Sequence, residues 1–116
     1  MKIIVKHMEM NSETGAVEGY TPVAEVNVSH IPHVDGDVSE ALEYAYRWTN
    51  NVMGSWSIQE EVINGYENGD LNHWVTVLVK REDGLGLRSS MMGDRFEVDG
   101  VDYRVAIAGF KKVETV

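Results

Sequence analysis

The chain has 116 residues, a formal charge of −9 and no cysteine, and 43% of its residues are hydrophobic. This length fits a single domain, 1–116, which buries roughly 65% of its unfolded surface and needs nearly all of its apolar side chains for one core. The absence of cysteine excludes disulfides, a thiol nucleophile and Cys-ligated zinc, and it favours a cytoplasmic location. No apolar run approaches the roughly 20 residues of a membrane span, and the first residues do not resemble a signal peptide.

The acidic charge is concentrated in the first part of the chain. Residues 1–70 contain twelve acidic and three basic side chains, whereas residues 71–116 contain seven of each. Arg47 is the only formal cation between His7 and Val79. A negative field of this kind attracts basic partners and repels nucleic acid backbones. We therefore expect a protein partner with a basic surface, no direct contact with nucleic acid and no membrane role, unless the acidity serves only solubility.

The N-terminal residues predict a β-hairpin. Residues 2–10 alternate between apolar and polar side chains, which is typical of a half-buried strand. The turn-forming cluster 11–15 follows, and residues 17–29 alternate again as one or two further strands. Residues 30–36 then predict a loop.

One amphipathic helix is predicted next. Asp37 is an N-cap acceptor with Glu40 three residues later, the pattern of a capping box. Apolar residues recur at three- and four-residue spacing from Leu42 to Met53, and Gly54 can end the helix in the left-handed conformation. The helix should run for about four turns and cover one side of a small sheet.

The remaining residues predict turns and strands. Asn-Gly dipeptides at 64–65 and 68–69 indicate tight turns in a loop or short hairpin. Residues 73–81 give the strongest strand signal, so we expect them in the centre of the sheet. Residues 95–98 and 101–107 predict a hairpin around an Asp-Gly turn. The expected fold is α+β, with one amphipathic helix packed on a curved, mostly antiparallel sheet of five to six strands.

Catalytic and metal-binding motifs are hard to assemble from this sequence. Residues 30–37 contain two histidines and two aspartates, but their spacing matches no metal motif, and Asp37 is better used as the helix cap. No serine lies in a nucleophile motif, and the adjacent Glu60 and Glu61 point apart on a strand or a helix. We therefore expect no enzyme activity, no metal and no cofactor.

The candidate partner-binding residues are exposed acids with two tyrosines among them. Tyr44 should lie with Glu40 and Glu43 on the outward face of the helix, and Tyr66 lies between the two Asn-Gly turns. The full set is Glu40, Glu43, Tyr44, Glu60, Glu61, Tyr66, Glu67 and Asp70. The alternative is a small-ligand or nucleotide-binding protein in which Arg88, Arg95 and Arg104 hold an anion.

The C-terminal third resembles a segment of short uncharacterised bacteriophage accessory proteins and, more weakly, of the YodL-like domain. In that pattern Arg-Ser-x-Ser-x-Gly-Asp introduces a strand, and a turn, a Tyr-x-Val strand and a Gly-Phe follow. Residues 86–96 (GLRSSMMGDRF), the Asp-Gly turn and residues 103–110 carry the pattern, with Met91 in place of the second serine. Residues 43–51 and 55–57 also resemble the phage proteins, so the likeness covers about 42–110.

This resemblance implies a non-enzymatic accessory protein that binds and inhibits a host protein of defence, transcription or replication. YodL-like domains occur beside anti-restriction modules, and the resemblance implies no catalytic residues. The same residues also fit a structural turn, in which Asp94 accepts backbone hydrogen bonds and Gly93 adopts a positive φ. An assembly factor and a homo-oligomer remain open alternatives.

Overall fold

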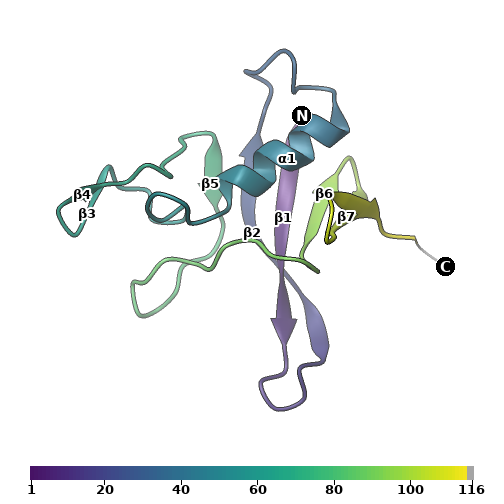
Figure 1. The fold of residues 1–116 in the computed structure, drawn as a ribbon, viewed down its shortest axis with the longest axis horizontal. Coiled ribbons are helices and arrows are strands. Elements are labelled where there is room, and N and C mark those ends of the chain that lie inside the picture. The colour runs from purple at the N-terminus through teal and green to yellow at the C-terminus, as the bar shows by residue number, and fades with distance from the viewer. Residues whose placement is uncertain (115–116) are drawn as a thin grey trace.

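The structure, a computed structural model, describes residues 1–114. Its elements are β1 (Lys2–Met10), β2 (Val17–Asn27), α1 (Val38–Trp48), β3 (Val62–Ile63), β4 (Tyr66–Glu67), β5 (Val75–Val77), β6 (Arg95–Val98), β7 (Val101–Val105) and β8 (Phe110–Lys112). Six strands form one antiparallel sheet in the order β5-β2-β1-β6-β7-β8, and β3 pairs with β4 in a separate hairpin. The helix crosses in front of the sheet (Figure 1). The predicted α+β fold is confirmed.

The long hairpin of β1 and β2 forms as predicted. The Asn11 side-chain oxygen accepts hydrogen bonds from the amides of Glu13 and Thr14 at 2.9 and 3.0 Å and so closes the turn. Pro22, which has no N–H to donate, lies at a register shift between the two strands. The hairpin of β6 and β7 also forms as predicted, because Asp99 and Gly100 both adopt the positive φ of a tight turn.

The helix begins where the sequence predicts and ends a turn early. Asp37 accepts a hydrogen bond from the amide of Glu40 at 3.1 Å, which confirms the N-cap. The predicted end near Met53 is wrong, since α1 stops at Trp48. The Thr49 hydroxyl donates to the carbonyl of Ala45 at 2.7 Å, and side-chain bonds of this kind compete with the next helical turn. The chain therefore turns away, and Met53 is exposed.

Residues 73–81 do not form the central strand. Only Val75–Val77 pairs, with β2 alone, at one edge of the sheet. A turn at Asn72 delays the start of this strand, and after Leu78 the chain leaves the sheet for an exposed loop of charged residues. The central position belongs to β1, because Ile3 and Val5 alternate on its buried face and it pairs on both sides.

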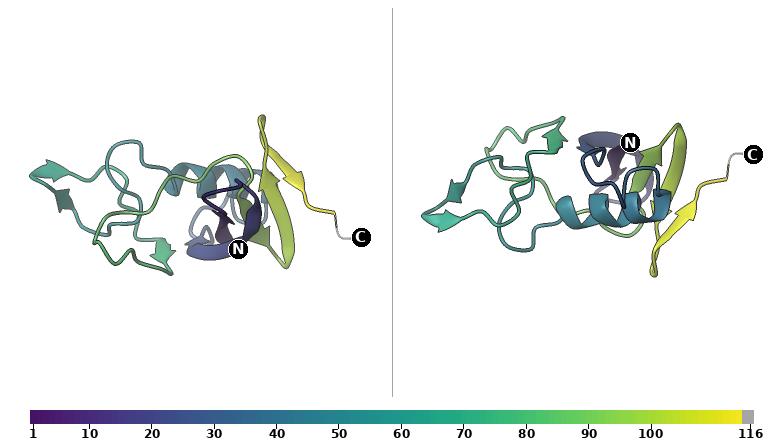
Figure 2. Two further views of the ribbon diagram at one scale, coloured as in Figure 1. Left: turned by 90° about the horizontal axis from the view of Figure 1, so that it is seen from below. Right: turned by 90° about the horizontal axis from the view of Figure 1, so that it is seen from above.

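The core lies between the helix and one face of the sheet. Ala41, Leu42 and Ala45 of α1 pack against the apolar side chains of β1, β2 and β6. The β3–β4 hairpin and the C-terminal strands lie at opposite ends of the molecule (Figure 2). Among residues 1–114 no helix is long and apolar enough to cross a membrane.

Candidate partner-binding surface

Four aromatic rings from three segments of the chain meet at the surface beside α1. His30 follows β2, Tyr44 and Trp48 lie on α1, and Trp74 precedes β5. The rings of His30 and Trp74 are stacked, with centroids 4.0 Å apart and planes 13° apart. Tyr44 lies 6.5 Å from His30 and 6.3 Å from Trp48. We call these four residues the aromatic cluster; Trp74 is 47% exposed and His30 is also exposed.

Helix geometry and one asparagine hold the aromatic cluster together. Tyr44 and Trp48 are four residues apart and therefore lie on the same side of the helix. The Asn72 side chain donates a hydrogen bond to the hydroxyl of Tyr44 and accepts one from the amide of Trp74, both at 2.9 Å. Asn72 thereby fixes the Trp74 loop against α1. The sequence gives no signal for this role, because it depends on a contact between distant segments.

The surface around the aromatic cluster is negatively charged. The guanidinium of Arg47 lies 4.2 Å from the ring of Trp48 and donates to Asp70 at 3.2 Å. The cation that contacts the cluster is therefore already paired. Glu40 and Glu43 are exposed on the preceding turn of α1, as predicted, and form no ion pair within residues 1–114. Their negative charge remains available to a partner.

Tyr44 is not the outward-facing side chain that the sequence predicts. It is half-buried, its ring packs against the core, and its hydroxyl is bonded to Asn72. The reason is that the loop before β5 folds back over this side of the helix. Tyr44 therefore supports the exposed rings of the cluster and offers little contact area of its own.

The other predicted surface residues lie on a separate projection. Tyr66, which is 79% exposed, and Glu67 lie on β4, and Glu60 and Glu61 directly precede β3 and are exposed. Asn64 and Gly65 adopt positive φ values of 52° and 82° and form the turn that the sequence predicts. The structure therefore divides the predicted acidic surface between the helix and this hairpin.

Asp70 is not on the surface, and its assignment as a partner contact is wrong. Its carboxylate is fully buried and accepts hydrogen bonds from the amides of Val52 and Met53 at 2.8 Å and from Arg47. The nearby Asn68 is also buried, and its amide nitrogen donates to three carbonyl oxygens of residues 55–60. These two side chains hold the loops after the helix in place.

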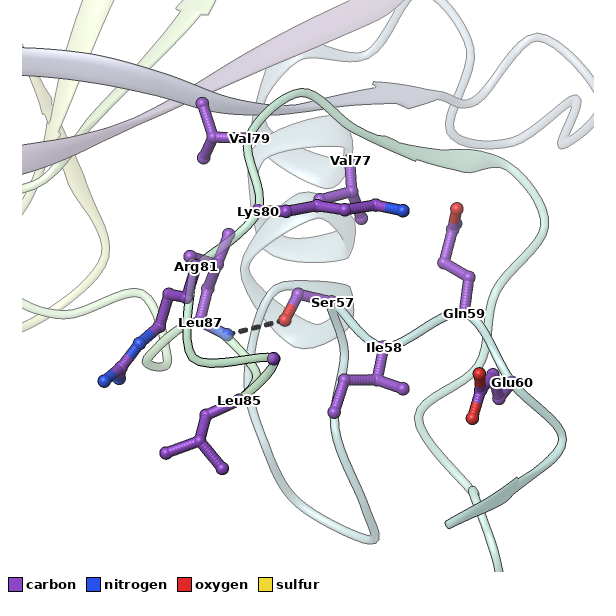
Figure 3. Close-up of a pocket in the computed structure, with 11 residues that line it drawn as sticks. Ser57, Ile58, Gln59, Glu60, Val77, Val79, Lys80, Arg81, Leu85 and Leu87 are labelled. Atoms are coloured by element: carbon purple, nitrogen blue, oxygen red, sulfur yellow. Dashed lines mark hydrogen bonds between the residues drawn. The ribbon is translucent and has the colours of Figure 1, made fainter.

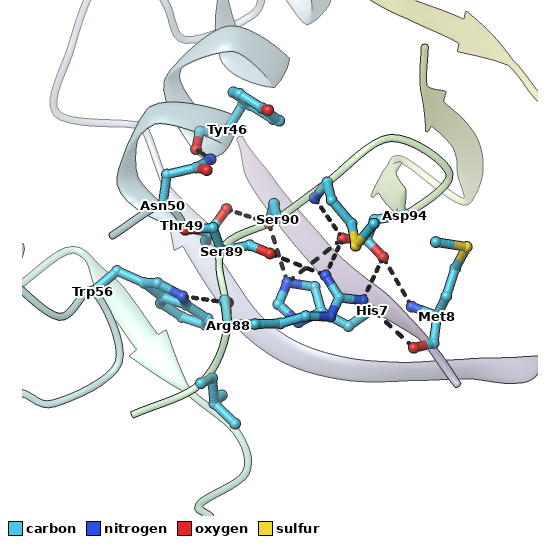
Figure 4. Close-up of polar contacts among 12 residues, drawn as sticks. His7, Met8, Tyr46, Thr49, Asn50, Trp56, Arg88, Ser89, Ser90 and Asp94 are labelled. Atoms are coloured by element: carbon cyan, nitrogen blue, oxygen red, sulfur yellow. Dashed lines mark hydrogen bonds and ion pairs between the residues drawn. The ribbon is translucent and has the colours of Figure 1, made fainter. Parts of the chain in front are cut away.

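The buried carboxylate of Asp94, paired with the exposed Arg88, forms a second anchor (Figure 4). The two terminal nitrogens of Arg88 each lie 2.8 Å from an oxygen of Asp94, which also accepts from the amides of Met8 and Met91. Burial alone would raise the pKa of Asp94, but these hydrogen bonds lower it below its usual value. Gly93 has a φ of 97°. The structural-turn interpretation is confirmed. Arg88 pairs with Asp94 but is itself exposed, and its assignment to an anion-binding site stays a prediction.

His7 and Ser90 continue this polar network without forming a catalytic triad. The Nε2 atom of His7 lies 3.1 Å from the Ser90 hydroxyl and 3.9 Å from Asp94, so one nitrogen makes both contacts. A triad needs the carboxylate at the other ring nitrogen. Ser90 is 3% exposed, and its hydroxyl lies 2.7 Å from that of Thr49. Burial lowers the pKa of His7 to about 4, although the negative charge of Asp94 acts in the opposite direction. The ring is therefore neutral at pH 7.

Arg95 and Arg104, the other two residues of the ligand alternative, lie directly opposite each other on β6 and β7. The guanidinium of Arg95 lies 4.3 Å from the ring of Tyr20, and Arg104 is exposed. The structure therefore brings two of the three predicted arginines together. Tyr20 contributes a contact that the sequence reasoning did not find.

One hollow of about 360 Å³ lies between residues 57–60 and the loop that follows β5 (Figure 3). Ile58, Val77 and Leu87 give it apolar walls, and Lys80 extends across it. The amide of Leu87 donates to the Ser57 hydroxyl at 2.6 Å and joins the two sides. Among its charged lining residues, Glu60 and Lys80 form no ion pair within residues 1–114, and Arg81 pairs with Asp83 outside the lining.

Comparison of the chain with protein-family models, with curated proteins and with solved structures found no match. The geometry of the surface therefore carries the functional inference.

Proposed function

We propose that this protein is a non-enzymatic binding protein that docks the aromatic cluster, with Glu40 and Glu43, onto a basic surface of a partner protein. One observation carries the proposal. Two tryptophans, a tyrosine and a histidine from three chain segments contact each other at a surface, and the cation that contacts them, Arg47, is already paired with Asp70. Tryptophan and tyrosine are the residue types that contribute most to binding energy at protein interfaces.

The cluster is also ordered before binding. Asn72 bonds to Tyr44 and to the amide of Trp74, and the stacked ring of His30 supports Trp74. A partner would therefore lose little free energy in ordering these side chains, which favours affinity. This order before binding supports the aromatic cluster as the centre of the interface.

Charge supports the choice of partner. Glu40 and Glu43 form no ion pair within residues 1–114, so they can attract a basic surface and speed its encounter. Tyr66 with Glu60, Glu61 and Glu67 gives the β3–β4 hairpin the same chemical character. We place this hairpin at the rim of the interface, as a second contact with the same partner.

The resemblance to phage accessory proteins supports a bacterial host protein as that partner. The acidic surface would then occupy a groove that the host protein uses for nucleic acid, in the host cytoplasm. Binding there would inhibit the host protein by competition.

The test uses two exposed apolar side chains as a matched pair. The full chain is immobilised as wild type, Trp74→Ala and Ile107→Ala, and bacterial lysate is passed over each; Ile107 is 93% exposed and lies outside the aromatic cluster. A protein retained by wild type and Ile107→Ala but at least tenfold depleted on Trp74→Ala would support the proposal. Equal retention by all three variants, or retention lost only with Ile107→Ala, would overturn it.

A further inference from the structure

The outer face of the sheet, opposite α1, carries a line of cations across four neighbouring strands. Lys6 of β1 is the partner of Arg95 in β6, and Arg95 is the partner of Arg104 in β7. Arg104 is in turn the partner of Lys111 in β8. Residues directly opposite each other on antiparallel strands project to the same face. This cationic row contains four of the ten Lys and Arg residues of an acidic chain.

Sheet stability does not account for the row. Like charges directly opposite each other on neighbouring strands destabilise a sheet. Lys6 is neutralised, because its Nζ lies 2.7 Å from Glu97 and 2.9 Å from Asp102. Arg104 and Lys111 are exposed and form no ion pair within residues 1–114. Arg104 and Lys111, at the end of the row away from Lys6, therefore keep an uncompensated positive charge.

Arg95 is positioned mainly by stacking. Its guanidinium lies over the ring of Tyr20, and its Nη1 reaches Asp102 only at 3.8 Å. Its buried Nε finds no hydrogen-bond partner within residues 1–114. A stacked guanidinium that makes few hydrogen bonds keeps donors for a planar or tetrahedral anion.

We propose that Arg95, Arg104 and Lys111 bind the phosphate groups of a polyphosphate ligand, either a free phosphate chain or the phosphate tail of a nucleotide. Guanidinium groups match phosphate oxygens in pairs, and neighbouring strands place successive cations about 4.8 Å apart. A short polyanion interacts mostly with this local row. A long nucleic acid is repelled by the net charge of −9. This site lies on the opposite face from the aromatic cluster and does not depend on the proposed function.

The experiment titrates the full chain with sodium tripolyphosphate and, separately, with ATP at the same low ionic strength without magnesium. Binding is measured by calorimetry and by amide chemical shifts. Arg104→Gln/Lys111→Gln is compared with the control Lys80→Gln/Arg81→Gln, which makes the same change in net charge in the exposed loop after β5. We expect wild type and control to bind alike and the row variant to bind at least tenfold more weakly. Equal affinities for the two probes would identify the phosphate chain as the ligand, and fivefold tighter binding of ATP would identify a nucleotide.

Two binding results would overturn the proposal. The first is that neither probe binds wild type saturably, and the second is that both double variants bind alike. Thermal unfolding is measured with and without tripolyphosphate, and the Tm without ligand tests for a structural role of the row. Because Arg104→Gln relieves repulsion, we expect it to keep or raise the Tm, while tripolyphosphate raises the Tm of wild type and not that of the row variant. A clear fall in Tm for Arg104→Gln would show a structural role for the row and would also contradict the proposal.

Discussion

Two groups of carboxylates in this molecule carry the same charge and do different things. Asp70 and Asp94 are fully buried, and each accepts hydrogen bonds from one arginine and two backbone amides. Glu40 and Glu43 are exposed on α1 and form no ion pair within residues 1–114. Part of the acidity of this chain is therefore structural. Only the second group is available to a partner.

Replacing a buried carboxylate should cost much more stability than replacing an exposed one. Asp94→Ala leaves Arg88 and two backbone amides without their buried acceptor, and leaving a buried donor unsatisfied costs roughly 1–3 kcal/mol of unfolding free energy. Glu43→Ala removes an exposed side chain and should change stability by less than about 0.5 kcal/mol. Urea denaturation of both variants measures the difference. Similar stability losses for the two would contradict the distinction.

The pH dependence of stability tests the buried network around Asp94. The pKa of His7 falls from 6.5 in the unfolded chain to about 4 in the folded protein. Between these values the unfolded state binds a proton that the folded state does not, so stability falls as pH decreases and is fully present above pH 6.5. The loss should reach about 3 kcal/mol.

His7→Gln provides the control for this effect, because glutamine does not titrate. The variant should show a flatter dependence of unfolding free energy on pH between 6.5 and 4 than wild type. Asp94 contributes in the same direction only at the acid end of that window, because its lowered pKa makes stability fall as the unfolded carboxylate protonates below about pH 5, and this contribution is common to both proteins. Parallel pH profiles for the two proteins would show that His7 is not the group responsible.

The helix cap should give a smaller loss of stability than the buried carboxylates. Asp37 is an exposed acid with a structural role, because it caps α1 through the amide of Glu40. Asp37→Ala should lower stability by about 1 kcal/mol and leave partner affinity unchanged. Thermal unfolding and a binding titration together check this. An unchanged Tm would show that Asp37 does not stabilise α1 as its N-cap.

Local signals explain what the sequence predicted correctly. The hairpin turns at Asn64 and Asp99 and the helix cap at Asp37 depend on residues that are adjacent or one turn apart. The sequence also indicated the exposed acids of the helix, because periodicity alone places Glu40 and Glu43 away from the core. These features depend on local backbone preferences and helix spacing.

The features that the sequence missed depend on contacts between distant segments. Asp70 is bonded to amides near residue 52, and Asn72 joins the Trp74 loop to the helix. The cationic row appears only once β1, β6, β7 and β8 are aligned, since its members are far apart in the chain. For the same reason the strong strand pattern at 73–81 did not reveal an edge position.

The most direct test of the account measures the association rate of the captured partner with two charge-reversed variants. Glu40→Lys/Glu43→Lys changes the surface beside the aromatic cluster, and Glu13→Lys/Glu18→Lys makes the same change in net charge on the exposed end of the β1–β2 hairpin. At low salt we predict that the helix variant associates at least tenfold more slowly than wild type. The hairpin variant should stay within about twofold of wild type. The difference between the two variants should shrink at high salt, because exposed charges are screened. Equal association rates for the two variants would contradict the claim that this surface of the helix binds the partner.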